Sequence, residues 1–286
     1  MKNGKAKHIA AKYFITIFIS TIIFIIHLFC FLQRTYAHRL WQSAPDREIV
    51  DISELLEKEA LSEDDYALLF LQTGLGKQAV DHFFAQNKKE EIFSYQEYYF
   101  AERSIVCESI VGWVTKSDYL ADNSGQKMFG TPFADIRPGD ILISLSSHSV
   151  GWLHGHAAIV IDSETVLQST CIGGLSEFAP LDTWRTHSNY TVLRVKNDDG
   201  ALGEAAADFA KEHLIDVPYD LFSGIFFQKN QNSKNFGAQC AYLVWYAWDR
   251  VGVDIDGNGG MVVAPEDILQ SPQLEIVQSY GIDFAD

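Results

Sequence analysis

Basic residues are scarce in this chain of 286 residues, which has 22 Lys and Arg against 38 Asp and Glu. The formal net charge is -16 at pH 7, and Lys and Arg form no cluster beyond the N-terminal end. Nucleic-acid-binding proteins need such clusters to contact phosphates, so we expect no nucleic-acid partner. A hydrophobic content of 47% with 13% aromatic residues excludes general disorder and is enough for a sizeable core.

The N-terminal end is the one basic part of the chain. Four lysines between residues 2 and 12 precede a long apolar run, Tyr13–Leu32. Such an arrangement directs a chain into or across a membrane with its basic end in the cytoplasm. Thr35-Tyr36-Ala37 has the small residues of a signal-peptidase site, yet a run of about twenty residues also spans a bilayer. Cleavage after Ala37 and retention as an anchor stay open. Either outcome places the rest of a bacterial protein outside the cytoplasm. We expect contact with the membrane only through this segment, if it stays uncleaved.

Cysteine is also scarce, and the four residues are Cys30, Cys107, Cys171 and Cys240. Because Cys30 lies in the apolar run, the exported part has at most one disulfide and one free thiol. Pairing of Cys107 with Cys171 stays open. An unpaired thiol in an exported protein is a candidate reactive group. A buried, inert cysteine is the more common alternative.

The sequence divides into residues 1–37, a signal peptide or anchor, residues 38–130, a helical accessory region, and residues 131–286, an α+β domain. In the accessory region, Ser62 is placed to cap a helix that ends near Gly74. An aromatic stripe on the helices that follow predicts packing against the next domain. In that domain we expect a small antiparallel sheet and two helices. The expected strands are residues 141–145, 156–162, 165–169 and 190–195, and the expected helices are residues 201–214 and 239–251.

Cys240 is the strongest candidate for a catalytic residue. It opens an apolar helix directly after a loop that contains Gly237. A helix N-terminus lowers the pKa of a thiol and supplies free N–H groups for a developing oxyanion. Cys240 is therefore placed as a nucleophile, although this position alone is a weak signal.

His156 is the candidate general base. It follows Gly155 at the start of an apolar strand, where its ring is expected to project toward a cleft. Gln168 lies on the next strand, across the short Ser163-Glu164 turn, and is placed to orient the imidazole. A histidine on a strand is more often structural, so the combination with Cys240 carries the prediction.

Two segments together resemble the circularly permuted branch of the NlpC family of papain-like cysteine peptidases, the YiiX/YebB-like proteins. Val217-Pro218-Tyr219, Gly224, the run from Phe236 to Val244 and Gly252 resemble the family segment "PY…G…FDCSGLV…G". The segments 137–142 and 155–160 resemble "PGDL…HVGIV". The histidine segment precedes the cysteine segment here, as in permuted members. The resemblance covers about residues 135–260 and implies a permuted papain-like domain.

The resemblance implies a role for each matching residue. Cys240 corresponds to the nucleophile, His156 to the base and Gln168 to the third polar residue, while Tyr219 matches a tyrosine near the oxyanion. Gln239 stands where the family has Asp before the nucleophile, and Ala241 where it has Ser, so the substrate subsites are in doubt.

The implied reaction is cleavage of an amide bond through a thioester, with no cofactor and no metal. Peptidoglycan peptides are the implied substrate, and lipid esters or amides, or acyl transfer, are the alternative. Trp152 is a candidate for stacking on a sugar beside the cleft, although an ordinary wall aromatic is equally compatible.

Three other interpretations stay open. His148, His154 and His156 occur within nine residues and match the donor types of a catalytic zinc site, although their loop is a poor scaffold. The segment 254–259 resembles the start of a calcium loop, but its twelfth position is Pro265 instead of Glu, which favours a polar turn. A non-catalytic binding module on the same fold is the third.

Overall fold

The computed structural model describes residues 2–40, 44–112, 114–149, 151–223, 229, 237–282 and 284. Gly224 and Phe236, which belong to the family-like segment, lie outside the described residues. The fold is mixed α+β with two antiparallel sheets and a long N-terminal helix.

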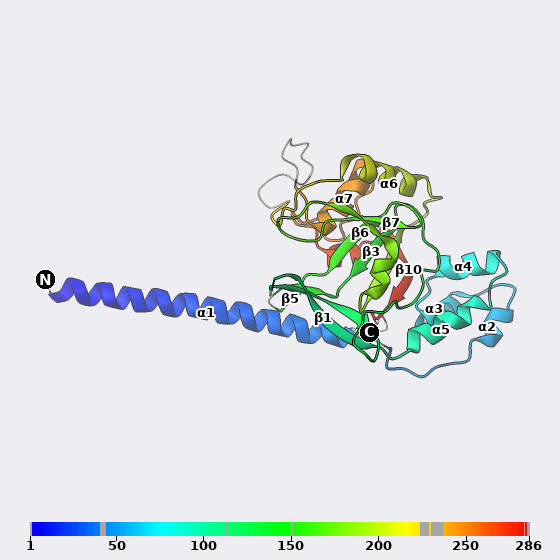
Figure 1. Cartoon of the computed structure of the whole chain (residues 1–286), viewed down its shortest axis with the longest axis horizontal. Helices are drawn as coiled ribbons and strands as arrows, with labels where there is room; N and C mark the ends of the chain where they lie inside the picture. Colours follow the sequence, from blue (N-terminus) through cyan, green and yellow to red (C-terminus); the bar gives the residue numbers. More distant parts are fainter. Residues whose placement is uncertain are drawn as a thin grey trace.

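The N-terminal helix α1 (Lys2–Leu40) projects away from the rest of the molecule (Figure 1). Its segment Lys12–Leu32 has a mean hydropathy of 2.6 and is long and apolar enough to cross a membrane. An N-terminal signal sequence has the same properties. Near its C-terminal end, α1 contacts the short strand β5 (Trp152–Leu153).

The larger sheet has six antiparallel strands in the order β10-β9-β3-β6-β7-β8. These are β10 (Leu274–Tyr280), β9 (Tyr190–Val195), β3 (Ile141–Ser144), β6 (His156–Val160), β7 (Thr165–Gln168) and β8 (Glu177–Pro180). The strands predicted at residues 141, 156, 165 and 190 are thus confirmed. β8 and β10 escaped prediction.

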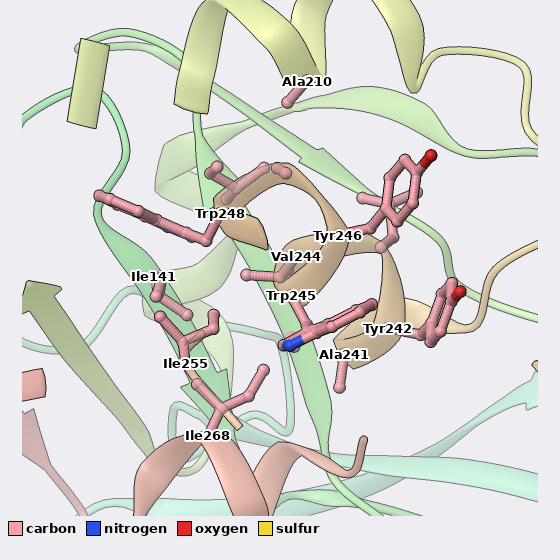
Figure 2. Packing of buried hydrophobic residues seen from close by; sticks show 14 of the residues in the cluster. Ile141, Ala210, Ala241, Tyr242, Val244, Trp245, Tyr246, Trp248, Ile255 and Ile268 are labelled. Carbon is pink, nitrogen blue, oxygen red and sulfur yellow. The ribbon is translucent and has the colours of Figure 1, made fainter. Parts of the chain in front are cut away.

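Both faces of this sheet are covered, and its side chains alternate between two cores. Ile141 and Ile159 face α6 (Ala201–His213), α7 (Cys240–Arg250) and α8 (Pro265–Leu269). Figure 2 shows this core around α7, where Trp245 and Trp248 are almost completely buried. Burial of such large side chains contributes about 1.5–3 kcal/mol each, so the position of α7 on the sheet is firmly fixed.

The opposite face of the sheet packs on the N-terminal helices α2 (Ser53–Glu57), α3 (Glu63–Thr73), α4 (Lys77–Ala85) and α5 (Glu91–Phe100). Ser62 caps α3 with a capping box, as predicted. The aromatic stripe, which includes Phe83, Tyr95 and Tyr99, belongs to the same core as Leu142 and Val160 of the sheet, so the stripe is packing surface.

Residues 38–130 are not helical throughout. After α5 the chain forms a hairpin of β1 (Ser104–Val111) and β2 (Thr115–Ala121), which continues through β4 (Ser147–Ser149) to β5. The prediction of a helical accessory region was wrong here. Most of β1 is exposed at the sheet edge. It therefore shows no clear hydrophobic alternation, the signal by which strands are found in a sequence.

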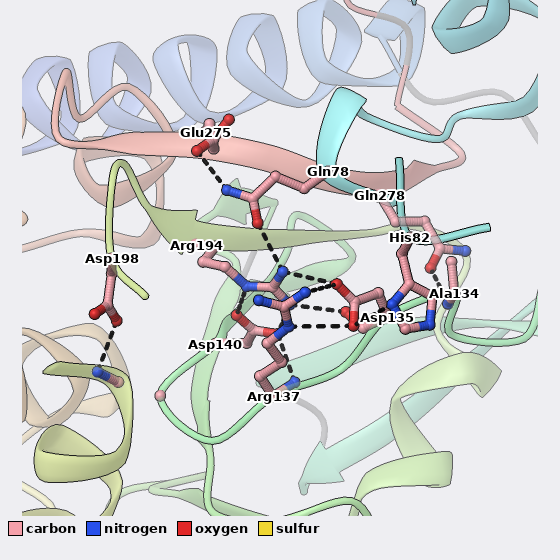
Figure 3. Close-up of polar contacts among 12 residues, drawn as sticks. Gln78, His82, Ala134, Asp135, Arg137, Asp140, Arg194, Asp198, Glu275 and Gln278 are labelled. Atoms are coloured by element: carbon pink, nitrogen blue, oxygen red, sulfur yellow. Dashed lines mark hydrogen bonds and ion pairs between the residues drawn. The ribbon is translucent and has the colours of Figure 1, made fainter. Parts of the chain in front are cut away.

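A buried ion network ties these parts together (Figure 3). Arg194 on β9 donates two hydrogen bonds of 2.7 Å to the carboxylate of Asp140, one of 2.8 Å to Asp135 and one of 2.7 Å to Gln78 of α4. Burial raises the pKa of Asp140 to about 6 against the opposing effect of Arg194. At Asp135 burial acts in the same direction, but the bonds and charge of Arg194 prevail and lower the pKa.

We expect Arg194→Leu to destabilise the fold by about 3–5 kcal/mol, because the buried Asp140 loses its cation and the buried Asp135 keeps only one of its two arginines, Arg137. Arg137 offers the matched control: it pairs with the same Asp135 at 2.8 Å, but its side chain is 42% exposed. Arg137→Ala should cost about 1 kcal/mol or less. Urea unfolding of the full-length protein in detergent, followed by tryptophan fluorescence, measures both. Equal losses would contradict the central position of Arg194.

Candidate active site

Cys240 is the first residue of α7, and the local sequence explains why the helix begins there. Gln239 is the N-cap, and its side-chain oxygen accepts from the N–H of Ala241 at 2.9 Å. Gly237 lies so close to the preceding loop that an added Cβ would be 2.7 Å from Asp220. Glycine therefore allows the loop to pass close to Asp220 just before Cys240.

His156 is the first residue of β6, an inner strand between β3 and β7. Gly155 precedes it with φ +70, and a Cβ there would lie 2.8 Å from the carbonyl oxygen of Ser144, so the turn requires glycine. His156 Nε2 lies 3.0 Å from Gln168 Oε1. Since this oxygen accepts, Nε2 carries the proton and Nδ1 is left as the basic atom.

One pocket of about 360 Å³ joins the candidate residues. Cys240, His156, Gln168 and Tyr219 all line it, although they come from α7, β6, β7 and the loop after α6. The loop position is fixed by two backbone bonds of 3.0 Å, from Tyr219 N to Gly174 O and from Ala238 N to Pro218 O. Four residues predicted from separate segments are thus brought to one cavity.

Burial keeps the resting thiol and imidazole neutral. It raises the pKa of the Cys240 thiol to about 11, although the backbone N–H groups of Ala157, Ala241 and Cys240 itself favour the thiolate. It also lowers the pKa of His156 to about 4, against the raising effect of Gln168. The Cys240 thiol donates to Gln239 Oε1 at 3.6 Å. The site therefore rests as thiol and imidazole, with proton transfer required during attack.

Tyr219 lines the same pocket as a neutral phenol. Burial raises the pKa of its phenol well above the usual value, and the neighbouring Cys240 adds to this effect. The phenol therefore keeps its proton at neutral pH and is able to donate to a negative oxygen.

Gln239 and Trp152 lie outside the pocket lining among the described residues. Besides capping α7, Gln239 donates to the carbonyl oxygen of Val263, so its side chain serves to fix the helix start. Trp152 is 49% exposed on β5 and contacts His154, a pocket residue, edge to face at 5.8 Å. Their substrate-binding roles stay predictions.

Trp184 and His187 are among the pocket residues that escaped prediction. The ring of Trp184 stacks on His156, with centroids 5.1 Å apart and planes 12° apart. His187 is only 8% exposed, and its Nδ1 lies 2.9 Å from Ser146 Oγ. Both lie at the 3-10 helix η1 (Leu181–Thr186) or directly after it. Because that segment has neither strand nor helix periodicity, the sequence alone gave no signal for their burial.

The three histidines predicted as a zinc alternative do not share one set of contacts. His148 lies beside Asp118 and Cys107. His154 lies with its Nε2 3.0 Å from Ser149 Oγ and its Nδ1 2.8 Å from Gly155 O, and His156 contacts Gln168. No disulfide bond joins Cys107 to Cys171.

The segment 254–259 is a polar turn. Asp254 Oδ1 accepts from Trp245 Nε1 at 2.8 Å and from the N–H of Asp256 at 3.1 Å. The carboxylate of Asp256 pairs with Lys229. The oxygens of a calcium loop would have to remain available for the ion, and here the chain's own donors occupy them.

Comparisons with known proteins give one similar sequence and one similar structure. No family model matches the chain. It is 28% identical over 163 residues to the uncharacterized protein YycO of Bacillus subtilis, a match that covers 54% of this chain and 63% of YycO. The chain thus spans less than two thirds of that curated relative. A crystal structure of the metalloprotein YiiX from Escherichia coli is similar at a TM-score of 0.38 and 19% identity, over 50% of this chain and 98% of YiiX.

The neutral resting pair predicts how Cys240 reacts with iodoacetamide. Since the thiol pKa is about 11, the alkylation rate should rise about tenfold per pH unit from pH 7 to pH 10. Mass spectrometry of the Cys240 peptide measures the rate, with Cys171 in the same samples as the internal comparison. A plateau reached by pH 7 would instead reveal a resting thiolate–imidazolium pair.

Proposed function

We propose that the protein is a thiol-dependent hydrolase that cleaves acyl bonds through a thioester on Cys240. The observation that carries the proposal is the shared pocket. The pocket is lined by the thiol of Cys240, at the start of a buried helix, and by the imidazole of His156. The Nε2 atom of His156 is hydrogen-bonded to Gln168 Oε1 at 3.0 Å. A nucleophile, a base and a group that orients the base are the parts this chemistry requires.

The mechanism follows from the protonation states. As the Cys240 sulfur attacks the substrate carbonyl, His156 Nδ1 takes the thiol proton, and Gln168 holds the ring through Nε2–H. The N–H of Cys240 and the Tyr219 hydroxyl donate to the oxyanion. His156 then gives the proton to the leaving amine as the C–N bond breaks. Water attacks the thioester with His156 again as base, the C–S bond breaks to release the acid, and His156 returns the proton to the Cys240 sulfur. Trp184 holds the imidazole face and favours the imidazolium that forms during each step.

Amide bonds of cell-wall peptides are the first substrate class of this proposal. The support is the resemblance of the two segments around His156 and Cys240 to permuted NlpC-type peptidases, which also supports a permuted papain-like arrangement. The apolar segment Lys12–Leu32 supports a location at the outer face of the cytoplasmic membrane or beyond, where such peptides occur.

Acyl lipids are the second substrate class, and the pocket walls favour them. Ile110, Tyr119, Phe129 and Trp184 contribute large apolar surfaces to the lining. The small sheet that carries Ile110 and Tyr119 also contacts α1 through β5. If α1 spans a membrane, the small sheet that carries Ile110 and Tyr119 is the part of the pocket wall next to the lipid. Hydrolysis of a lipid ester or amide uses the same residues in the same roles.

Substitution of Cys240 by Ala should abolish turnover, by about a thousandfold or more, because the nucleophile is lost. The full-length protein is incubated with peptidoglycan fragments and, separately, with acyl lipids in mixed micelles, and products are read by mass spectrometry. Cys171→Ala is the matched control and should retain turnover. Full activity of the Cys240 variant on the substrate found would disprove the proposal.

Replacing Gln168 by Glu tests the orienting contact on that same substrate. A carboxylate beside Nε2–H favours the imidazolium, so the pKa of His156 rises and the acid limb of the pH–rate profile moves upward by about one pH unit or more. Gln168→Ala should lower the rate without shifting the acid limb of the pH–rate profile to higher pH. The rate is measured from pH 4 to pH 9. An unchanged acid limb in Gln168→Glu would show that His156 is not the titrating base.

A further inference from the structure

We propose a metal site on the small sheet, formed by Cys107, Asp118 and His148, that binds a divalent transition-metal ion of the zinc class. The donor atoms of the three side chains all lie within 4.8 Å of one another. Cys107 Sγ is 3.6 Å from His148 Nε2, and that nitrogen is 3.5 Å from Asp118 Oδ1. The site does not depend on the proposed function of Cys240.

Strand register brings the three donors to one face. Cys107 of β1 is directly opposite Asp118 of β2, and His148 of β4 is opposite Lys116, two residues along β2. Residues directly opposite or two apart point to the same side of a sheet. Three neighbouring strands therefore each contribute one ligand type that zinc prefers.

The distances fit a metal ion better than a proton relay. A tetrahedral zinc with bonds of about 2.3 Å to sulfur and about 2.0–2.1 Å to nitrogen or oxygen separates its S and N donors by roughly 3.6 Å and its N and O donors by roughly 3.4 Å. The S–N and N–O separations here are 3.6 and 3.5 Å. In a Cys-His-Asp relay, the thiol and the carboxylate contact different ring nitrogens. Here both lie at Nε2, which points to one shared ion.

Charge and burial favour the same ion. A thiolate and a carboxylate directly opposite each other repel, and a divalent cation between them neutralises both. Asp118 and His148 are 5% and 6% exposed, whereas Cys107 is an exposed residue. The buried pair fixes the ligand geometry, and Cys107 gives the ion a path from solvent. The ion would link β1, the exposed edge strand, to β2 and β4.

This site is separate from the Cys240 pocket. Thr115 and Tyr119 of β2 line that pocket, and Asp118 lies at odd spacing from both, so its side chain is on the other face of the strand. Ser147, next to His148 on β4, also lines the pocket. The small sheet thus presents one face to the pocket and the other to the proposed ion.

The test is titration of the reduced full-length protein, in detergent and without oxygen, with Co²⁺ as a probe for Zn²⁺. Elemental analysis after Zn²⁺ loading gives the stoichiometry. We expect one ion per chain and a thiolate-to-cobalt charge-transfer absorption in the near ultraviolet. Cys107→Ser should lose that absorption and His148→Ala should lose binding. Cys171→Ser and Cys240→Ser, the matched thiol controls, should retain both.

Two outcomes would overturn the site. One is wild-type protein that binds no Co²⁺ through a thiolate. The other is an absorption that persists in Cys107→Ser and disappears in Cys240→Ser, which would place the ion in the pocket. Circular dichroism checks that each variant is folded. Because Cys107 is exposed, its Ser variant decides the result if His148→Ala unfolds.

Discussion

Arg194 lies where three parts of the fold meet that are far apart in the sequence. Its guanidinium joins β9 to Asp140, just before β3, to Asp135 in the preceding loop and to Gln78 of α4. Other arrangements of these three segments would leave a buried guanidinium or carboxylate unpaired, which would lower the free energy of unfolding. β3 lies between β9 and β6 in the sheet. The network therefore helps to fix the position of β3, the neighbour of the strand that carries His156.

The two hydrophobic cores hold the sheet and α7 in the positions that form the candidate active site. Apolar side chains of the sheet alternate between α7 on one face and the N-terminal helices on the other. The same burial that fixes α7 also removes water from Cys240 and His156, which accounts for their opposite pKa changes. A rigid site with a neutral resting pair is the consequence. Reactivity then depends on a substrate whose developing charge the amide and phenol donors stabilise.

The small sheet gives the molecule a second chemical feature. One face of β2 closes the thiol pocket, and the other brings a thiol, a carboxylate and an imidazole together. β1 has little hydrophobic core of its own, so a metal ion would supply the cross-link that packing does not. The contact of β5 with α1 places this sheet next to the apolar N-terminal segment.

The sequence by itself determined the features that depend on neighbours along the chain: the apolar segment Lys12–Leu32, the capped helix after Ser62, four strands of the larger sheet and the helix that begins at Cys240. Periodicity and capping depend on residues close together in the chain, so they can be recognised in the sequence alone. The sequence also named Cys240, His156, Gln168 and Tyr219 as candidates, and the fold brings them to one pocket. Only the tertiary structure decided that Trp184 stacks on His156, that His187 is buried, that β1 and β2 form a hairpin and that Cys107 meets His148. Those contacts join residues distant in sequence through strand register and burial, which no local pattern encodes.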